Sequence, residues 1–372
     1  MPSNTTTPVL YALGSNGSGQ LGIGLNQDVS IPREVLFRPG SEPSSPVVQI
    51  AAGGNHTLLL TADGKLYWAG DSSTGACGPL SQEAKAYAAK FIAQEVALPN
   101  PENDIAPPVK FIAATWESSI VVQSSTLYTF GAGQKGELGL GQFIVRTPTP
   151  TALPSFPPPS TGIVDIAACM SHAVVVLDNG EVWGWGNGRK GQLGPLCKGV
   201  AQEPVKVEGL EFKAVKAVCG REFTALFGSR DTGEVCVLGT DKAGVQSSAP
   251  ERALGWRDVG ATWGGVYILN EDGTLLSWGK DDHGQLAPPG LPKLAKLAVG
   301  SEHVVALTED GDVISWGWGE HGNCGPQVEN NDVKGRWNTI ASQKYIPPGS
   351  KITAIGAGCA TSWVSLELAR QP

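Results

Sequence analysis

Residues 179–194 read Asn-Gly-Glu-Val-Trp-Gly-Trp-Gly-Asn-Gly-Arg-Lys-Gly-Gln-Leu-Gly, and this stretch decides the fold. An Asn-Gly pair between two apolar runs, here after Val174–Leu177, is a strong local signal for a tight β-hairpin. A second short apolar run follows and ends at Gly186, where a glycine-rich loop begins. The stretch therefore predicts strand, turn, strand and loop.

The same unit recurs along the whole chain. A glycine preceded by an apolar residue is followed five positions later by another glycine at seven places: Gly14/Gly19, Gly70/Gly75, Gly131/Gly136, Gly186/Gly191, Gly239/Gly244, Gly279/Gly284 and Gly317/Gly322. The first glycines of successive units are 38 to 61 residues apart. Blades of β-propellers repeat at about 40–50 residues, whereas solenoid coils are shorter. The repeat predicts an all-β propeller with seven blades.

The two ends of the chain carry complementary halves of one unit. The first copy begins at Val9 and has the glycine loop but no preceding strand. The last segment, residues 352–366, has the strand half and then no loop. Pairing the halves completes a seventh blade and removes the open sheet edges of the ring. We predict a single monomeric domain spanning residues 1–372, with repeats over about 9–368.

Three long segments interrupt the repeat. Residues 79–108, 147–162 and 326–348 are polar or rich in proline, so they are predicted to be connections outside the blade cores. Good helix formers at residues 81–90 predict one short surface helix there.

Composition limits the function classes. Glycine and proline number 49 and 27 among 372 residues, which favours turns over long helices, and the net charge is −8 with no Lys/Arg run longer than two. A surface that neutralises phosphates needs clustered cations, so direct nucleic-acid binding is disfavoured. No membrane span or signal peptide is predicted. Seven cysteines without a C-x-x-C pair predict reduced thiols in a cytosolic or nuclear protein.

Features that resemble catalytic or cofactor motifs all fall into repeat positions. Three segments match G-x-G-x-x-G, but none is followed by a helix-forming stretch that would hold a pyrophosphate. His56, His172 and His303 share one repeat position, where we expect the imidazole to bond backbone between strands. Because no histidine, cysteine or carboxylate pair stands outside the repeat, no enzyme activity, cofactor or metal is predicted.

One variable repeat position is different. It directly precedes the second strand of each unit, and its seven residues are predicted to ring one mouth of the channel. Four consecutive units carry large side chains there, and we predict a protein-binding site made of Trp116, Glu117, Met170, Arg221, Glu222 and Trp263, with Trp363 as a further neighbour. The alternative is that Trp116 and Trp263 only plug the channel.

The repeat resembles that of the propeller family named after the regulator of chromosome condensation. Its pattern of Gly-x-x-His, Asp-Gly, Trp-Gly and Gly-Gln-Leu-Gly is matched by residues 53–56, Asp63-Gly64, Trp185-Gly186 and residues 191–194, and the resemblance covers residues 9–368. The fifth copy departs from it, with Gly-Val-Gln-Ser at residues 244–247.

Within that family the chain looks like a fungal branch that consists of one acidic propeller. This resemblance implies a scaffold in cytoplasm and nucleus that binds a small metal-binding protein of the CSL zinc-finger type. That pair would support diphthamide synthesis and, through the partner, Elongator-dependent modification of tRNA wobble uridines. The alternative that the family offers is a guanine-nucleotide exchange factor for a small Ras-like nuclear GTPase.

Overall fold

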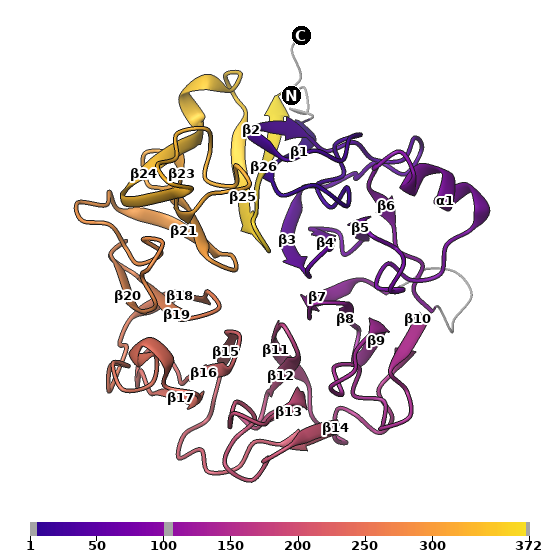
Figure 1. Ribbon diagram of the computed structural model, residues 1–372, viewed down its shortest axis with the longest axis vertical. Helices are drawn as coiled ribbons and strands as arrows, with labels where there is room; N and C mark the ends of the chain where they lie inside the picture. Colours follow the sequence, from indigo (N-terminus) through magenta and orange to yellow (C-terminus); the bar gives the residue numbers. More distant parts are fainter. Residues whose placement is uncertain (1–5, 100–106, 370–372) are drawn as a thin grey trace, which may run out of the picture.

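The computed structural model describes residues 6–99 and 107–369, and these form seven antiparallel sheets in a ring (Figure 1). Blade 1 contains β25 (Lys351–Ala357), β26 (Thr361–Ala369), β1 (Thr6–Gly14) and β2 (Val29–Glu34). Blade 2 contains β3 (Val47–Ala52), β4 (His56–Thr61), β5 (Leu66–Gly70) and β6 (Gln94–Glu95). Blade 3 contains β7 (Val109–Ala114), β8 (Ser118–Gln123), β9 (Thr126–Ala132) and β10 (Arg146–Ala152). Blade 4 contains β11 (Ile163–Cys169), β12 (His172–Leu177), β13 (Val182–Asn187) and β14 (Val200–Lys206).

The remaining blades complete the ring. Blade 5 contains β15 (Lys216–Cys219), β16 (Phe223–Phe227) and β17 (Val235–Gly239). Blade 6 contains β18 (Trp256–Ala261), β19 (Gly265–Asn270) and β20 (Leu275–Gly279). Blade 7 contains β21 (Leu294–Val299), β22 (His303–Thr308), β23 (Asp312–Trp318) and β24 (Asp332–Ser342). The seven-bladed propeller predicted from the glycine repeat is confirmed.

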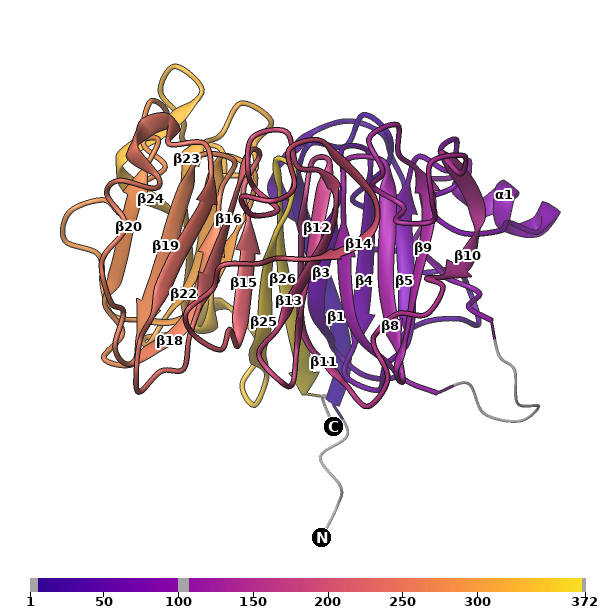
Figure 2. The ribbon, with the colours of Figure 1, turned by 90° about the horizontal axis from the view of Figure 1, so that it is seen from below.

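The two ends of the chain close the ring inside blade 1. β1 pairs with β26 over nine residues, from Thr6 opposite Ala369 to Gly14 opposite Thr361. Both strands therefore lead to the termini at one face of the ring, as Figure 2 shows. The opposite face, where β1 ends and β26 begins, is called the mouth face below.

Each repeat glycine at the end of a third strand is required by backbone contact. Gly186 has φ +95°, and a Cβ atom there would lie 2.4 Å from the carbonyl oxygen of Ser171. The first glycine of each of the other six pairs also has a positive φ. A Cβ atom at any of them would lie 2.2–2.7 Å from the matching carbonyl oxygen. Any other residue would clash with the backbone, which explains why the repeat is read most easily from its glycines.

Polar side chains join neighbouring blades. Three histidines that precede or begin second strands bond a hydroxyl of the next blade at 3.0–3.2 Å, in the pairs His56 with Ser119, His172 with Thr224 and His303 with Ser362. The expected backbone partner is present for His172, at Phe223, and for His303, at Thr361. The hydroxyl partners were not expected, and they arise because the second strand of the next blade presents a Ser or Thr side chain at this level. Three indoles also donate to a carbonyl of the preceding blade, namely Trp185 to Glu137, Trp278 to Val245 and Trp316 to Gln285.

All three segments expected to be connections contain a strand. β10 begins one residue before the segment 147–162 and continues into it, and β24 lies within 326–348, where each forms the outermost strand of its blade. These strands were not predicted because the segments around them are polar and contain proline. An outermost strand tolerates both, since it is half-exposed and one of its edges makes no backbone hydrogen bonds. The segment 79–108 holds β6 and the predicted helix, α1 (Gln82–Ala88), and residues 100–106 of it lie outside the described part. In blades 5 and 6, which have the two shortest repeat intervals, no fourth strand follows in the described chain.

No helix among the described residues is long and apolar enough to cross a bilayer.

Deleting residues 350–372 should abolish cooperative unfolding, because it removes β25 and β26 and exposes both β1 and β21 at an open ring. Calorimetry would measure this. The control is Leu366→Ala, which leaves a cavity worth about 2–5 kcal/mol in a buried position but keeps the ring closed, so it should lower Tm and preserve one sharp transition. A truncated chain that melts as sharply as the full chain, at the same temperature, would contradict the closure.

Acidification should destabilise the ring through the three inter-blade histidines. Burial lowers the pKa of His56, His172 and His303 to about 4. In the unfolded chain these groups titrate near ~6.5, so the unfolded state binds protons first as pH falls. The stability that these histidines contribute is therefore fully present above pH ~6.5 and is lost between pH ~6.5 and pH ~4. Over this range the free energy of unfolding falls by roughly 1.4 kcal/mol per histidine for each pH unit.

Tm measured from pH 7 to pH 5 tests this. His172→Gln, which cannot titrate, should show a shallower decline of Tm than the natural chain. Parallel declines in the two proteins would show that His172 is not responsible.

Candidate functional site

A ring of backbone hydrogen bonds lines the mouth of the channel. The N–H of Gly54 donates to the carbonyl of Trp116 at 2.8 Å, and the N–H of Trp116 donates to the carbonyl of Met170 at 2.8 Å. Farther round, Arg221 donates to Trp263 at 3.0 Å, and Trp263 donates to Ser301 at 2.8 Å. These bonds run from blade to blade at one level, so they fix the position from which each side chain projects.

The two tryptophans of this ring meet across the mouth. Trp116 belongs to blade 3 and Trp263 to blade 6, yet their ring centroids are only 6.1 Å apart and inclined by 50°. The indole of Trp116 lies over Gly54, where a Cβ atom would approach it to 2.5 Å. Trp116 is still 39% exposed. The pair thus covers the channel with one side and presents the other to solvent.

Charged side chains flank the pair. The exposed guanidinium of Arg221 lies 5.7 Å from the ring centroid of Trp263, within range of a cation–π interaction. Glu117 is exposed beside Trp116, and Glu222 bonds Lys242 at 2.7 Å. Met170 is half-buried below the pair and has φ +52°. These six predicted residues lie on consecutive blades around one mouth.

Trp363 does not belong to this group. It is fully buried as the third residue of β26, where it packs in the core between blades 1 and 2. Side chains alternate along a strand, and the Trp363 position faces the neighbouring blade. Its prediction as a contact residue was wrong.

Beneath the tryptophan pair lies a cavity of about 310 Å³ lined by the innermost strands of all blades. Most of its wall is small and apolar, and three thiols contribute to it: Cys169, Cys219 and Cys359. Burial raises the pKa of all three thiols, that of Cys169 to about 12. They are therefore protonated and poorly nucleophilic near neutral pH. Lower in the channel, Lys216 bonds the buried Asp165 at 2.9 Å.

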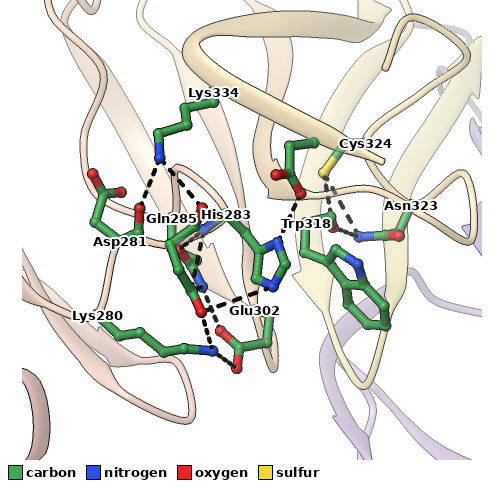
Figure 3. Close-up of polar contacts among 11 residues, drawn as sticks. Lys280, Asp281, His283, Gln285, Glu302, Trp318, Asn323, Cys324 and Lys334 are labelled. Carbon is green, nitrogen blue, oxygen red and sulfur yellow. Dashed lines mark hydrogen bonds and ion pairs between the residues drawn. The ribbon is translucent and has the colours of Figure 1, made fainter. Parts of the chain in front are cut away.

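A polar cluster between blades 6 and 7 was not predicted (Figure 3). The buried carboxylate of Glu302 is held by Lys280 at 2.9 Å and by the amide of Gln285 at 2.6 Å. His283 reaches from blade 6 to Asp332 of blade 7 at 2.9 Å. The sequence Lys280-Asp281-Asp282-His283 was the available signal, but it does not reveal which partners lie on the next blade. The charged and polar side chains of this cluster thus have hydrogen-bond partners within the protein, and their bonds join blades 6 and 7.

Nothing in the described chain forms a metal site: no group of three His, Cys, Asp or Glu side chains there is placed to hold an ion. Cys324, next to the polar cluster, is buried and contacts the carbonyl of Trp318, and burial raises its pKa to about 12. The mouth of the channel presents aromatic rings and charged side chains on a rigid surface, and such groups are suited to binding another protein.

Comparison with known proteins identifies the family. A family model described as the RCC1-like domain matches residues 9–364. An RCC1 repeat-containing protein of Schizosaccharomyces pombe is 30% identical over 377 residues, which cover 96% of this chain and 99% of the relative. The chain belongs to the RCC1-like domain family.

Two further matches extend this assignment. A mouse protein named secretion-regulating guanine nucleotide exchange factor is 27% identical over 418 residues, covering 98% of this chain and 85% of the mouse protein. The crystal structure of Prp20p from Saccharomyces cerevisiae has a TM-score of 0.79 at 21% identity and covers 99% of this chain and 93% of that one. The latter similarity shows the fold of this RCC1-like chain.

Gly54→Ala should separate the two indoles without removing either, because the added methyl group occupies the place of the Trp116 ring. We expect the exciton coupling between Trp116 and Trp263 in circular dichroism to fall. Tm should change little, since the displaced ring can move into solvent. Gly17→Ala, where a Cβ atom meets nothing within 4 Å, is the matched control. An unchanged spectrum would show that the pair is not held as described.

Proposed function

We propose that this protein is a non-catalytic platform that binds a small protein on its mouth face. The observation that carries the proposal is the exposed side of the Trp116–Trp263 pair with Arg221 against it. Tryptophan and arginine are enriched among residues that dominate binding energy in protein interfaces. A closed ring holds them in place before binding, so little conformational freedom is lost on association.

For the partner we propose a small metal-binding protein of the CSL zinc-finger type. This follows from the resemblance to the single-domain fungal alpha-tubulin suppressor, with which the chain shares its single propeller and acidic charge. In that role the complex supports diphthamide synthesis on elongation factor 2 and, through the partner, Elongator-dependent tRNA modification. The protein would act in cytoplasm and nucleus and be monomeric without its partner.

A second candidate is a guanine-nucleotide exchange factor for a small Ras-like nuclear GTPase. The mouse relative is named a guanine nucleotide exchange factor, and the similarity extends over 98% of this chain. Exchange requires a propeller to bind a GTPase and lower its affinity for nucleotide, which needs no catalytic side chain of the hydrolytic kind.

Trp116→Ala and Trp263→Ala should each weaken partner binding by about 2–4 kcal/mol, roughly 30- to 1000-fold in Kd. Binding to the purified CSL-type protein would be measured by calorimetry and Tm by thermal unfolding. Tyr345→Ala is the matched control, because Tyr345 is an aromatic residue 88% exposed near the opposite face. Normal binding in both tryptophan variants would place the partner elsewhere, and a lowered Tm with normal binding would assign the pair to the plug.

Release of fluorescent nucleotide from the GTPase separates the two candidates. The platform hypothesis with a CSL-type partner expects no acceleration when the chain is added. Acceleration that Trp116→Ala abolishes would instead establish the exchange factor.

A further inference from the structure

The glutamine of the Gly-Gln-Leu-Gly motif, or a glutamate in its place, locks four of the seven loops of the mouth face. Its side-chain oxygen, or that of a glutamate in its place, accepts the backbone N–H of the residue two positions earlier at 2.6–2.9 Å. The pairs are Ser18 with Gln20, Lys135 with Glu137, Lys190 with Gln192 and His283 with Gln285. The residue before the second glycine is therefore presented at a fixed place on the mouth face.

In blades 3, 4 and 5 the loops and the mouth ring carry a set of exposed cations. This basic arc consists of Lys135, Arg189, Lys190, Arg221 and Lys242. The loop of blade 5 has Val245 at the position of the glutamine and is held instead by Asp241, whose carboxylate accepts the backbone N–H groups of Gln246 and Ser247. The loops are tied to the mouth ring by backbone bonds, with Ala132 donating to Glu117 and Asn187 to Ser171. Hence the arc runs directly beside Trp116 and Trp263. Such a set is unusual in a chain of net charge −8.

Most cations of the arc have no ion-pair partner in the described part of the chain. Among the described residues, Lys135, Arg189, Lys190 and Arg221 make no ion pair, and Lys242 pairs with Glu222. The hydrogen bond to Lys242, together with the charges of Lys242, Lys190 and Arg221, lowers the pKa of Glu222. Glu117 and Asp241 are exposed in the same blades, and Glu137 lies beside Lys135.

The opposite side of the mouth face is acidic. Asp281, Asp282 and Glu320 are exposed on the loops of blades 6 and 7, and Asp28 is exposed in blade 1 beside His321. Two lysines also lie there: Lys280 pairs with Asp282, and Lys334 donates to the carbonyls of Asp281 and Asp282. A negatively charged ligand on the basic arc would be repelled from this side. Positive and negative side chains therefore lie on opposite sides of the mouth face, and this asymmetry favours one orientation of a charged ligand.

We propose that the basic arc binds an acidic segment of a protein partner, whose apolar side chain packs on Trp116 and Trp263. The inference rests on the proposed function, because it names the chemistry of the partner at the same face. A protein segment is favoured over a nucleic acid because the net charge of the chain is −8 and the acidic side of the mouth face would repel a long phosphate chain.

The probe is the fluorescein-labelled peptide Glu-Asp-Glu-Leu-Glu-Asp-Glu, followed by fluorescence polarisation at low and physiological salt. The variant carries Lys135→Glu, Arg189→Glu and Lys190→Glu. We expect it to bind the peptide at least about tenfold more weakly, and the natural chain to lose affinity as salt rises. The control carries the same charge change on the opposite face, through Lys65→Glu, Lys110→Glu and Lys351→Glu, and should bind nearly as well as the natural chain.

Failure to bind the peptide, or equal losses in variant and control, would overturn the inference. It would also be overturned if a short DNA duplex bound the arc more tightly than the peptide and lost as much affinity in the variant. These outcomes are independent of the CSL-type partner. If the tryptophan variants lose that partner while the peptide behaves alike in variant and control, the proposed function stands and the acidic-segment inference fails.

Discussion

The antiparallel pairing of β1 with β26 is the constraint on which the rest of the structure depends. Each blade contributes its apolar faces to two neighbours, so an unclosed ring would leave one blade exposed on one face and with an unpaired edge. Nine paired residues join the two ends of the chain and make every blade an interior one. The closure also brings blade 1 against blade 7, where His303 bonds the hydroxyl of Ser362.

Closure also explains why the side chains of the mouth face hold fixed positions although they are carried by loops. Backbone bonds at the mouth ring join blade 2 to 3, 3 to 4, 5 to 6, 6 to 7 and 7 to 1. Together with the histidine–hydroxyl bonds below them, they hold the blades at one level. In four loops the glutamine, or the glutamate in its place, then fixes the backbone that carries the outward side chain. Loops are ordinarily the mobile part of a protein, but here their amides are satisfied within the loop or by the adjacent blade.

The glycine repeat was sufficient to predict the architecture because of one contact in every blade. The third strand of each blade ends next to a carbonyl oxygen of the turn between the first two strands, and only glycine fits there. It could not predict β10, since an outer strand with Pro148 and Pro150 lacks the apolar alternation of an inner one. Trp363 was misplaced because the burial of a strand residue depends on which neighbour it faces. The contact of Trp116 with Trp263 depends on the width of the ring and on both side-chain orientations, neither of which is local in sequence.

The two interpretations of the tryptophan pair, plug and anchor, are compatible in physical terms. Each indole has two sides, and the side over Gly54 and the channel wall contributes to packing whether or not a partner is bound. The outer side of Trp116 and the Arg221 guanidinium contribute only when another surface excludes water from them. Because the inner contacts fix the rings beforehand, a partner gains the outer contacts without ordering any side chain. Under the proposed function, the packing that makes the pair a plug would thus also make it an effective anchor.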